Sequence, residues 1–322
     1  MINKEKYRQL CEEEPTIPIF SQAWWLDAVA GDNWDVCIVE KGDKIQASMP
    51  YVVKKKYGLT LLTQPSLTQN LGPWIRPAHA KYSKLLSQQK DLMEALIDQL
   101  PKYHYFSQNW HYSNTNWLPF YWRGFEQTTR YTYVIDGLQS LSNSDIFSGF
   151  SSSYKNKIRK AEKIVSIQRG LEPERFYLIN EKTFSRQGID IPYSKPFFLK
   201  QDEACKKKSC REIFFAEDEN GVIHSALYLT WDSMSSYVHL VGEDPEYRNS
   251  GAGILLIWEA IKYTKEILLL SKFDFEGSMI EGVERVRRDC GGKQMAYHSI
   301  SHISARWLNT AIHLKKALKG QA

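Results

Sequence analysis

One stretch, residues 237–262, constrains the fold of this chain more than any other. It reads as an apolar strand, a turn with the sequence RNSGAG at 248–253, and a helix whose apolar residues recur at helical spacing from Ile254 to Ile261. The first N–H groups of a helix lack partners within it, and the helix dipole favours negative charge at that end. Glycines remove the Cβ atoms that would hold a ligand away. The stretch therefore predicts a phosphate site between a strand and a helix.

The same turn has other interpretations. An ordinary strand-to-helix turn also uses glycines, because they allow close packing. The turn is not a Walker loop, since no Gly-Lys-Ser/Thr follows it, and it is a poor dinucleotide fingerprint, since position 256 is Leu rather than Gly. The phosphate site and the plain packing turn both remain open at this point.

Composition narrows the class of protein. The 322 residues are 43% hydrophobic and 25% charged, which is typical of a soluble globular protein with room for two domains. The net charge of +5 is too weak to indicate nucleic acid by itself, and we expect no DNA partner. The five cysteines are scattered without zinc-site spacing, so we expect reduced thiols, no metal and a cytoplasmic protein. No apolar run is long enough for a membrane span.

The order of predicted elements gives the fold class. After a basic helix beginning at residue 152, three strands are expected at 211–217, 222–232 and 236–241, followed by the glycine turn and its helix. A strand near 268–275, a helix at 278–290, a strand at 297–303 and a closing helix at 305–318 complete the pattern. The first half repeats it more weakly, with strands from residues 34, 45, 59 and 131 around a helix at 79–100. This order predicts an α/β (α+β) protein, with a domain boundary after residue 140.

The spacing Arg248-x-x-Gly251-x-Gly253 resembles the pyrophosphate-binding turn of the GNAT acyltransferases, which cradles coenzyme A. The resemblance implies two GNAT-like domains, each a mixed, mostly antiparallel sheet flanked by helices. Residues 1–140 would form a degenerate N-terminal domain without its own glycine turn. Residues 141–322 would form the C-terminal domain that carries the donor-binding turn.

Further local matches resemble the FemAB-like acyltransferases and the Fem aminoacyltransferases of peptidoglycan synthesis. They are the Trp-Trp segment at 20–26, the glycine loop at 68–73, the basic helix at 157–161, and the strand at 273–277 followed by Gly291-Gly292. Fem enzymes proper take an aminoacyl group from tRNA and often carry a coiled-coil insertion, for which this chain has no long heptad segment.

The resemblance implies an N-acyltransferase that moves an acyl group from acyl-CoA to an amine of a sugar, peptide or cell-envelope precursor. A tRNA-dependent Fem-type aminoacyltransferase, using aminoacyl-tRNA, is the first alternative. A non-catalytic module that binds an anionic ligand or a partner protein is the second.

The resemblance also implies a set of site residues. The donor would contact Leu240, Val241, Arg248, Asn249, Ser250, Gly251, Ala252 and Gly253, and main-chain N–H groups near 240–242 would bind the oxyanion. The acceptor would contact Trp24, Tyr51, Gln69, Asn70 and Arg159.

Acyl transfer to an amine needs a proton acceptor, and the predicted candidates are Glu276, Asp274 and Glu243, with His239 as a further one. Asp274 and Glu276 alternate with phenylalanines, so both project to one side of their strand. A capping role for Glu276 and a packed core position for His239 are the plainer alternatives.

Overall fold

The computed structural model describes residues 2–277 and 279–304, and its contacts divide the chain into two compact units. Unit 1 takes Met1–Arg130 and Ala296–Ala322 as far as they are described, and unit 2 takes Tyr131–Met295. The chain passes from one unit to the other inside strand β6 (Glu126–Asp136) and returns inside strand β12 (Lys293–Ile303). The sequence placed the boundary after residue 140, whereas the contacts change between residues 130 and 131. The helix expected at 305–318 lies outside the described residues.

The sheet of unit 1 has the strand order β1-β2-β3-β5-β12-β6. Its other strands are β1 (Trp34–Lys41), β2 (Lys44–Lys56), β3 (Leu59–Thr63) and β5 (Tyr105–Asn109), and short β4 (Trp74–Ile75) pairs with β2. Strands β3 and β5 run parallel, while the pairs β1–β2, β2–β3 and β5–β12 are antiparallel. The predicted hairpin of β1 and β2 turns at Gly42, whose φ of +61° is a conformation that glycine adopts easily.

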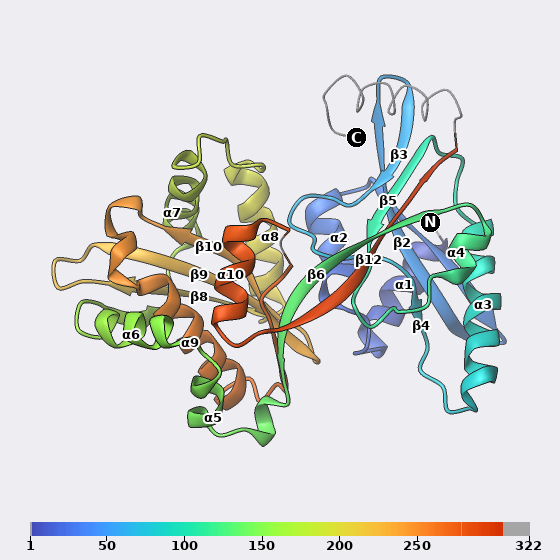
Figure 1. Cartoon of the computed structure of the whole chain (residues 1–322). Coiled ribbons are helices and arrows are strands. Elements are labelled where there is room, and N and C mark those ends of the chain that lie inside the picture. The colour runs from blue at the N-terminus through green and yellow to red at the C-terminus, as the bar shows by residue number, and fades with distance from the viewer. Residues whose placement is uncertain (1, 278, 305–322) are drawn as a thin grey trace, which may run out of the picture. The chain divides into compact units, whose positions relative to one another are not determined.

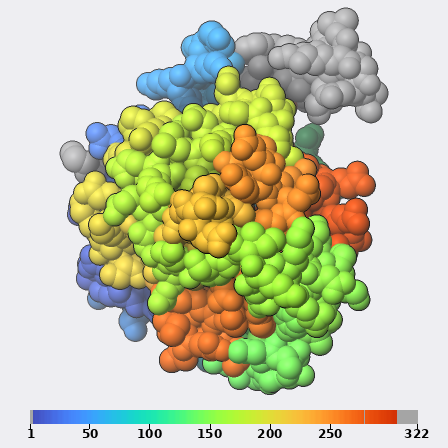
Figure 2. Space-filling model, turned by 90° about the vertical axis from the view of Figure 1, so that its left-hand side faces the viewer, coloured from blue at the N-terminus to red at the C-terminus, as the bar shows by residue number. Residues whose placement is uncertain are grey.

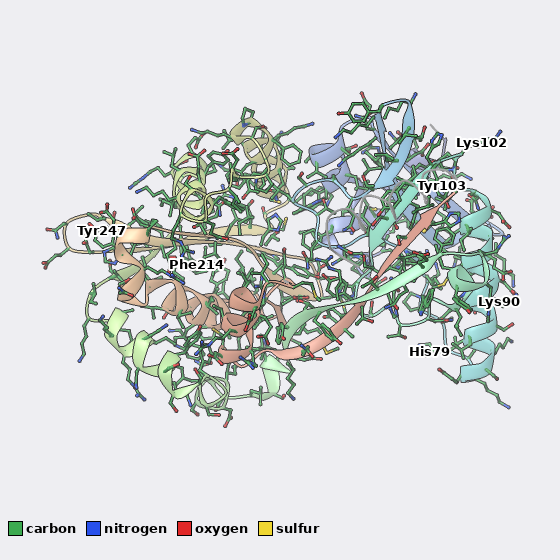
Figure 3. All side chains as sticks on the ribbon, turned by 45° about the horizontal axis from the view of Figure 1, so that its top comes forward. His79, Lys90, Lys102, Tyr103, Phe214 and Tyr247 are labelled. Atoms are coloured by element: carbon green, nitrogen blue, oxygen red, sulfur yellow. The ribbon has the colours of Figure 1, made fainter. Side chains whose placement is uncertain are left out.

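Helices cover both faces of this sheet. Alternate residues of a strand point to opposite faces, and β1 has apolar residues on both. Val36 and Ile38 pack in a core with α1 (Ile2–Glu13) and α2 (Ala23–Ala30), while Cys37 packs in a second core with α3 (Tyr82–Asp98) and α4 (Leu118–Trp122). The 3-10 turn η1 (Ile19–Ser21) leads into α2. Lys90 of α3 lies away from these cores and pairs with Glu94 in the next turn of the helix (Figure 3).

The sheet of unit 2 has the strand order β6-β11-β10-β9-β8-β7. The strands are β7 (Ser166–Arg169), β8 (Arg211–Glu217), β9 (Ile223–Trp231), β10 (Ser235–Glu243) and β11 (Lys272–Asp274). Strands β10 and β11 run parallel, and the pairs β6–β11, β7–β8, β8–β9 and β9–β10 are antiparallel. Both units thus have a mixed, mostly antiparallel sheet flanked by helices, and the predicted fold class is confirmed.

The helices of unit 2 lie on both faces of its sheet, with α7 (Pro173–Ser185) and α8 (Lys195–Lys207) on one face and α6 (Ser152–Ala161) and α9 (Ala252–Glu266) on the other (Figure 1). The remaining elements are η2 (Leu138–Ser140), α5 (Asn143–Ser148), η3 (Pro245–Ser250) and α10 (Glu281–Asp289). Phe214 of β8 is buried against the ring of Tyr263 on α9 (Figure 3). The strand, turn and helix predicted from residues 237–262 are present as β10, η3 and α9.

Candidate active site

The parallel strands β10 and β11 separate partway along the sheet of unit 2. They pair from Ser235 opposite Lys272 to Tyr237 opposite Asp274, where β11 ends, while β10 continues to Glu243. The register of β10 against β9 shifts at His239, because Val238 pairs with Leu229 and Leu240 with Tyr228. Past Tyr237, the edge of β10 that faces away from β9 is therefore not covered by β11.

A cavity of about 440 Å³ opens at this separation. Three parts of unit 2 form its walls, namely β10, the first turn of α9 and the C-terminal end of α7, and the segment around α10 closes a further side. The lining residues are Thr183, Arg186, Gln187, Val238, His239, Leu240, Val241, Glu243, Arg248, Gly253, Ile254, Ile257, Phe275, Ile280, Gly282, Val283, Val286 and Arg287. Of the predicted donor contacts, Leu240, Val241, Arg248 and Gly253 line it.

The turn from β10 to α9 leaves one helix N–H group open to this cavity. The Ala252 N–H donates to Ser250 Oγ at 3.2 Å. The Gly253 N–H has no hydrogen-bond partner within the described residues, and Gly253 borders the cavity. Arg248 is more than half exposed at the rim, where its Nε lies 3.5 Å from Glu243 Oε2. An open N–H at a helix start beside a guanidinium can bind a phosphate oxygen.

The two glycines of the turn are explained by different physical causes. Gly251 has φ +85°, and a Cβ there would lie 2.7 Å from the main-chain oxygen of Lys157, so this glycine allows α6 to pack against the turn. Lys160 of α6 also donates to the Asn249 carbonyl oxygen at 3.0 Å, and α6 adjoins the turn on the face shown in Figure 2. A Cβ on Gly253 would meet its nearest neighbours, Glu243 Oε1 and Ser225 Oγ, at 3.4 Å. The packing interpretation therefore applies to Gly251, and Gly253 is the glycine that borders the cavity.

Two of the predicted carboxylates lie in a buried network behind the cavity. Asp274 accepts a hydrogen bond from Thr132 Oγ1 at 2.6 Å and from the Glu276 N–H at 2.9 Å. Burial raises the pKa of Asp274 to about 7, and the neighbouring Glu276 carboxylate adds to the rise. Neither Asp274 nor Glu276 is among the residues that line the cavity.

Glu276 instead reaches the cavity through His239. Its Oε1 lies 2.9 Å from His239 Nδ1, and both side chains are almost fully buried. Glu276 also has φ +50°, which is rare for a residue with a Cβ and is often found at functional sites. His239, which lines the cavity, is therefore oriented by a carboxylate, an arrangement typical of an imidazole that accepts a proton.

The third predicted carboxylate, Glu243, lies in the cavity wall beside the turn. Burial raises its pKa, while the cationic groups of Arg248, Arg186 and Lys157 oppose the rise. Arg186 was not predicted as a site residue. It lies far from residue 243 in sequence, and only the packing of α7 against β10 brings it near.

The predicted acceptor residues divide between the units. Trp24 is half-buried with its ring against Trp25, Tyr51 is buried in β2, and Gln69 and Asn70 lie in the loop after β3, all in unit 1. The Asn70 side-chain oxygen is buried without a hydrogen-bond partner among the described residues. Arg159 is exposed on α6 in unit 2, contacts Asn156 at 3.4 Å and does not line the cavity. Their contact with an acceptor stays a prediction.

Sequence reasoning missed two side chains of α7 that bond to the open edge of β10. Asn180 Nδ2 donates to the Val241 carbonyl oxygen at 2.7 Å, and the Glu243 N–H donates to Thr183 Oγ1 at 2.9 Å. One signal was available: Gly242 interrupts an apolar strand, and a glycine in a strand often marks a close backbone approach. A Cβ on Gly242 would lie 2.7 Å from the main-chain nitrogen of Asn180.

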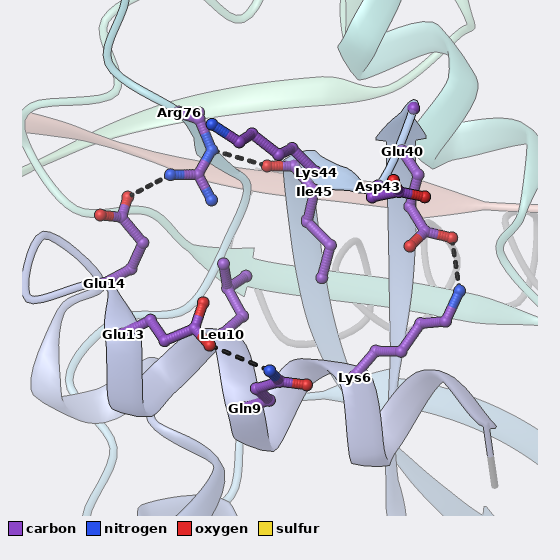
Figure 4. Close-up of a pocket in the computed structure, with 11 residues that line it drawn as sticks. Lys6, Gln9, Leu10, Glu13, Glu14, Glu40, Asp43, Lys44, Ile45 and Arg76 are labelled. Atoms are coloured by element: carbon purple, nitrogen blue, oxygen red, sulfur yellow. Dashed lines mark hydrogen bonds and ion pairs between the residues drawn. The ribbon is translucent and has the colours of Figure 1, made fainter.

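A second hollow, of about 620 Å³, lies in unit 1 between α1 and the β1–β2 hairpin (Figure 4). Four of its charged groups pair with one another: Lys6 pairs with Glu40 at 2.7 Å and Arg76 with Glu14 at 3.1 Å. Across residues 2–277 and 279–304, no cluster of three or more potential metal ligands is found. Over the same ranges, no helix combines the length and hydropathy of a membrane span.

Comparison with known proteins adds a domain match and a fold. Residues 148–285 match the model of the acetyltransferase (GNAT) domain. A search of curated proteins gave no match. Among solved structures, FemX is similar over 97% of this chain and 98% of its own, at 13% identity and a TM-score of 0.69. L-PGS from Bacillus licheniformis is similar over 97% and 96% of the chains, at 10% identity and a TM-score of 0.59. A tandem GNAT protein from the clavulanic acid biosynthesis pathway is similar over 94% of each chain, at 8% identity and a TM-score of 0.52.

Proposed function

We propose that this chain is an N-acyltransferase, because residues 148–285 match the model of the acetyltransferase (GNAT) domain and the chain has the fold of tandem GNAT proteins. The proposal rests on one observation above all. The cavity at the separation of β10 and β11 joins an open helix N–H at Gly253 to a carboxylate-oriented imidazole at His239. Such a cavity suits a donor that has phosphate at one end and a reactive carbonyl at the other.

The chemistry follows from the groups in the cavity wall. The neutral nitrogen of an acceptor amine attacks the donor carbonyl carbon, and the proton that it loses passes to His239, which Glu276 holds in place. Main-chain groups of β10 past the register shift that Asn180 and Thr183 leave unbonded stabilise the oxyanion. The new N–C bond remains as the bond from carbon to the carrier breaks, and the proton that His239 took up passes to the departing sulfur or oxygen of the carrier. Glu243 and Arg248 lie at the phosphate end of the cavity, so we assign them to donor binding.

Two donors have the phosphate that the turn requires. Acyl-CoA carries a pyrophosphate, and aminoacyl-tRNA carries phosphodiesters next to its acylated ribose. The acceptor is an amine of a sugar, peptide or cell-envelope precursor, and the residues proposed to bind it are Trp24, Tyr51, Gln69 and Asn70, together with Arg159. The tandem GNAT fold supports both donors equally.

One observation favours the aminoacyl-tRNA alternative. The Val241 carbonyl oxygen and the Glu243 N–H, which an extended donor arm would use, are already bonded to Asn180 and Thr183. An aminoacyl ester has no such arm, because its acyl group is joined directly to a ribose.

The proposal is tested by measuring donor binding to the wild type and to Arg248→Glu. We expect CoA or charged tRNA to bind the wild type, and the binding of that donor to weaken tenfold or more in Arg248→Glu, because a carboxylate replaces the cation at the phosphate end. Titration calorimetry measures CoA binding, and filter binding at fixed salt measures tRNA binding.

Arg175→Glu is the matched control, because Arg175 is exposed on the first turn of α7 and does not line the cavity. An equal loss of donor affinity in Arg248→Glu and Arg175→Glu would show that only the net charge of the protein matters. It would argue against a donor site at the turn. Absence of binding by either donor would leave a non-catalytic ligand-binding module as the better interpretation.

A further inference from the structure

The open edge of β10 is where a donor arm would lie, so the state of its main-chain groups decides which donors fit. In an antiparallel pair, alternate residues direct their N–H and C=O groups toward the partner strand and away from it. The Asp244 N–H donates to the carbonyl oxygen of His224 in β9, so Asp244 and Gly242 face β9. Val241 and Glu243 therefore face the other way, into the space that β11 leaves open.

Helix α7 takes up these outward groups. Asn180 Nδ2 donates to the Val241 carbonyl oxygen at 2.7 Å, and Thr183 Oγ1 accepts from the Glu243 N–H at 2.9 Å. The Thr183 hydroxyl lies 3.4 Å from the Glu243 carbonyl oxygen as well. Two side chains one turn apart on α7 thus imitate the bonds that an added strand would make.

These side chains are held in place by their own surroundings. Asn180 is 2% exposed, and its Oδ1 accepts a hydrogen bond from the hydroxyl of Tyr193. Tyr193 is in turn fixed by Tyr177, whose hydroxyl donates to the Tyr193 carbonyl oxygen at 3.1 Å. The backbone of α7 also lies directly over Gly242, where a Cβ would be 2.7 Å from the Asn180 nitrogen. Displacing Asn180 would leave several buried polar groups unpaired, which costs free energy.

We infer that Asn180 and Thr183 are a selectivity device, which closes the edge of β10 against donors whose acyl group sits on an extended amide arm. The inference rests on the proposed acyltransfer. It assigns to α7 the rejection of pantetheine thioesters, whose arm carries two amides that would pair along such an edge. It leaves room for an acyl group on a compact carrier, since Val238, Leu240 and Ile257 still line an apolar cavity beside His239.

The test separates the arm of CoA from its phosphates. Titration calorimetry compares CoA with 3′-phospho-ADP, its nucleotide half, on the wild type and on Asn180→Ala/Thr183→Ala. In the wild type, we expect CoA to bind no more than about threefold tighter than the nucleotide, because the arm gains nothing. In the double variant, CoA should gain about tenfold or more, while the affinity for the nucleotide stays the same.

Controls keep the test decisive. Ser185→Ala changes another polar residue of α7 that is exposed and does not line the cavity, and it should bind both ligands as the wild type does. If the double variant does not fold, Thr183→Ala alone opens the Glu243 N–H and should gain about threefold for CoA.

Two results would overturn the inference. One is wild-type CoA binding at least tenfold tighter than nucleotide binding. The other is a folded variant that gains no affinity for CoA. If neither the wild type nor any variant binds the nucleotide, the result counts against the phosphate turn, which belongs to the proposed function. A gain in CoA affinity in the double variant would still support the role of α7.

Discussion

At the scale of single residues, the two buried carboxylates behind the cavity, Asp274 and Glu276, have different partners although they lie close together. Asp274 is fully enclosed and accepts from Thr132 and from the Glu276 main chain, while Glu276 turns its side chain to His239. A strained φ of +50° at Glu276 makes this possible, because it redirects the chain directly after β11. The sequence predicted that both carboxylates point to one side of a strand. In the structure, Asp274 is buried in the hydrogen-bond network, whereas the Glu276 side chain bonds to His239.

The raised pKa of Asp274, about 7, makes stability depend on pH. An unfolded aspartate titrates near about 3.9, so the folded state favours the protonated carboxyl. The stability that this provides is complete below the unfolded value and is lost as the pH rises through the folded one. We expect the free energy of unfolding of the wild type, relative to Asp274→Asn, to fall by up to about 4 kcal/mol between pH 4 and pH 8.

Urea unfolding of both proteins at several pH values measures this difference. Asp136→Asn is the control, because the Asp136 carboxylate is exposed, where it accepts from the Gly137 N–H and lies 3.8 Å from Lys272 Nζ. A gap between wild type and Asp274→Asn that does not change with pH would show that Asp274 titrates normally in the folded protein.

At the scale of elements, the junction of α6, η3 and α9 shows what the sequence could predict. The strand, the glycine turn and the helix were recognised from residues 237–262, because their periodicity and glycines are local signals. The role of Gly251 in close packing was not recognised from the sequence, because it depends on Lys157, which lies on another helix. The hydrogen bonds of Asn180 and Thr183 to β10 are equally non-local. Local pattern therefore predicted the elements, and the packing between them determined which residues form the cavity wall.

Substituting Gly251 tests this junction. Gly251→Ala introduces a Cβ at φ +85° and 2.7 Å from the Lys157 oxygen, so it combines backbone strain with a steric clash. We expect a loss of roughly 3 kcal/mol in the free energy of unfolding. Gly170→Ala is the matched control, because Gly170 has φ +81° but nothing within 4 Å of the added Cβ.

The control should lose only about 1 kcal/mol, the cost of the left-handed conformation alone. Denaturant unfolding curves of the two variants give both numbers. If the two losses are equal, α6 yields to the added methyl group, and the glycine is required for its φ rather than for close packing.

At the scale of the whole molecule, the chain order and the compact units do not coincide. The sequence predicted two consecutive domains, since its element pattern repeats along the chain. In the structure, β12 begins in unit 2 and continues into unit 1, where it pairs with β5 from Ser299 opposite Asn109 to Ile303 opposite Tyr105. Sequence periodicity identifies a strand at 297–303 but carries no information about which sheet receives it. Strand pairing between residues nearly 200 apart in sequence cannot be inferred from local pattern.

The core of unit 1 should consequently depend on a residue near the end of the described chain. Ile300 of β12 is 0% exposed and belongs to the same hydrophobic cluster as Phe106 of β5 and Leu96 of α3. Ile300→Ala removes three buried carbon atoms, and we expect it to cost roughly 3 kcal/mol and to lower the hydrogen-exchange protection of the β5 amides. Ile267→Ala is the control, because Ile267 is 62% exposed and should change stability by less than about 0.5 kcal/mol. Ile300→Ala could instead lose as little free energy of unfolding as Ile267→Ala, with the β5 amides still protected. The N-terminal residues would then complete their core without β12, and the two units would follow the order of the sequence.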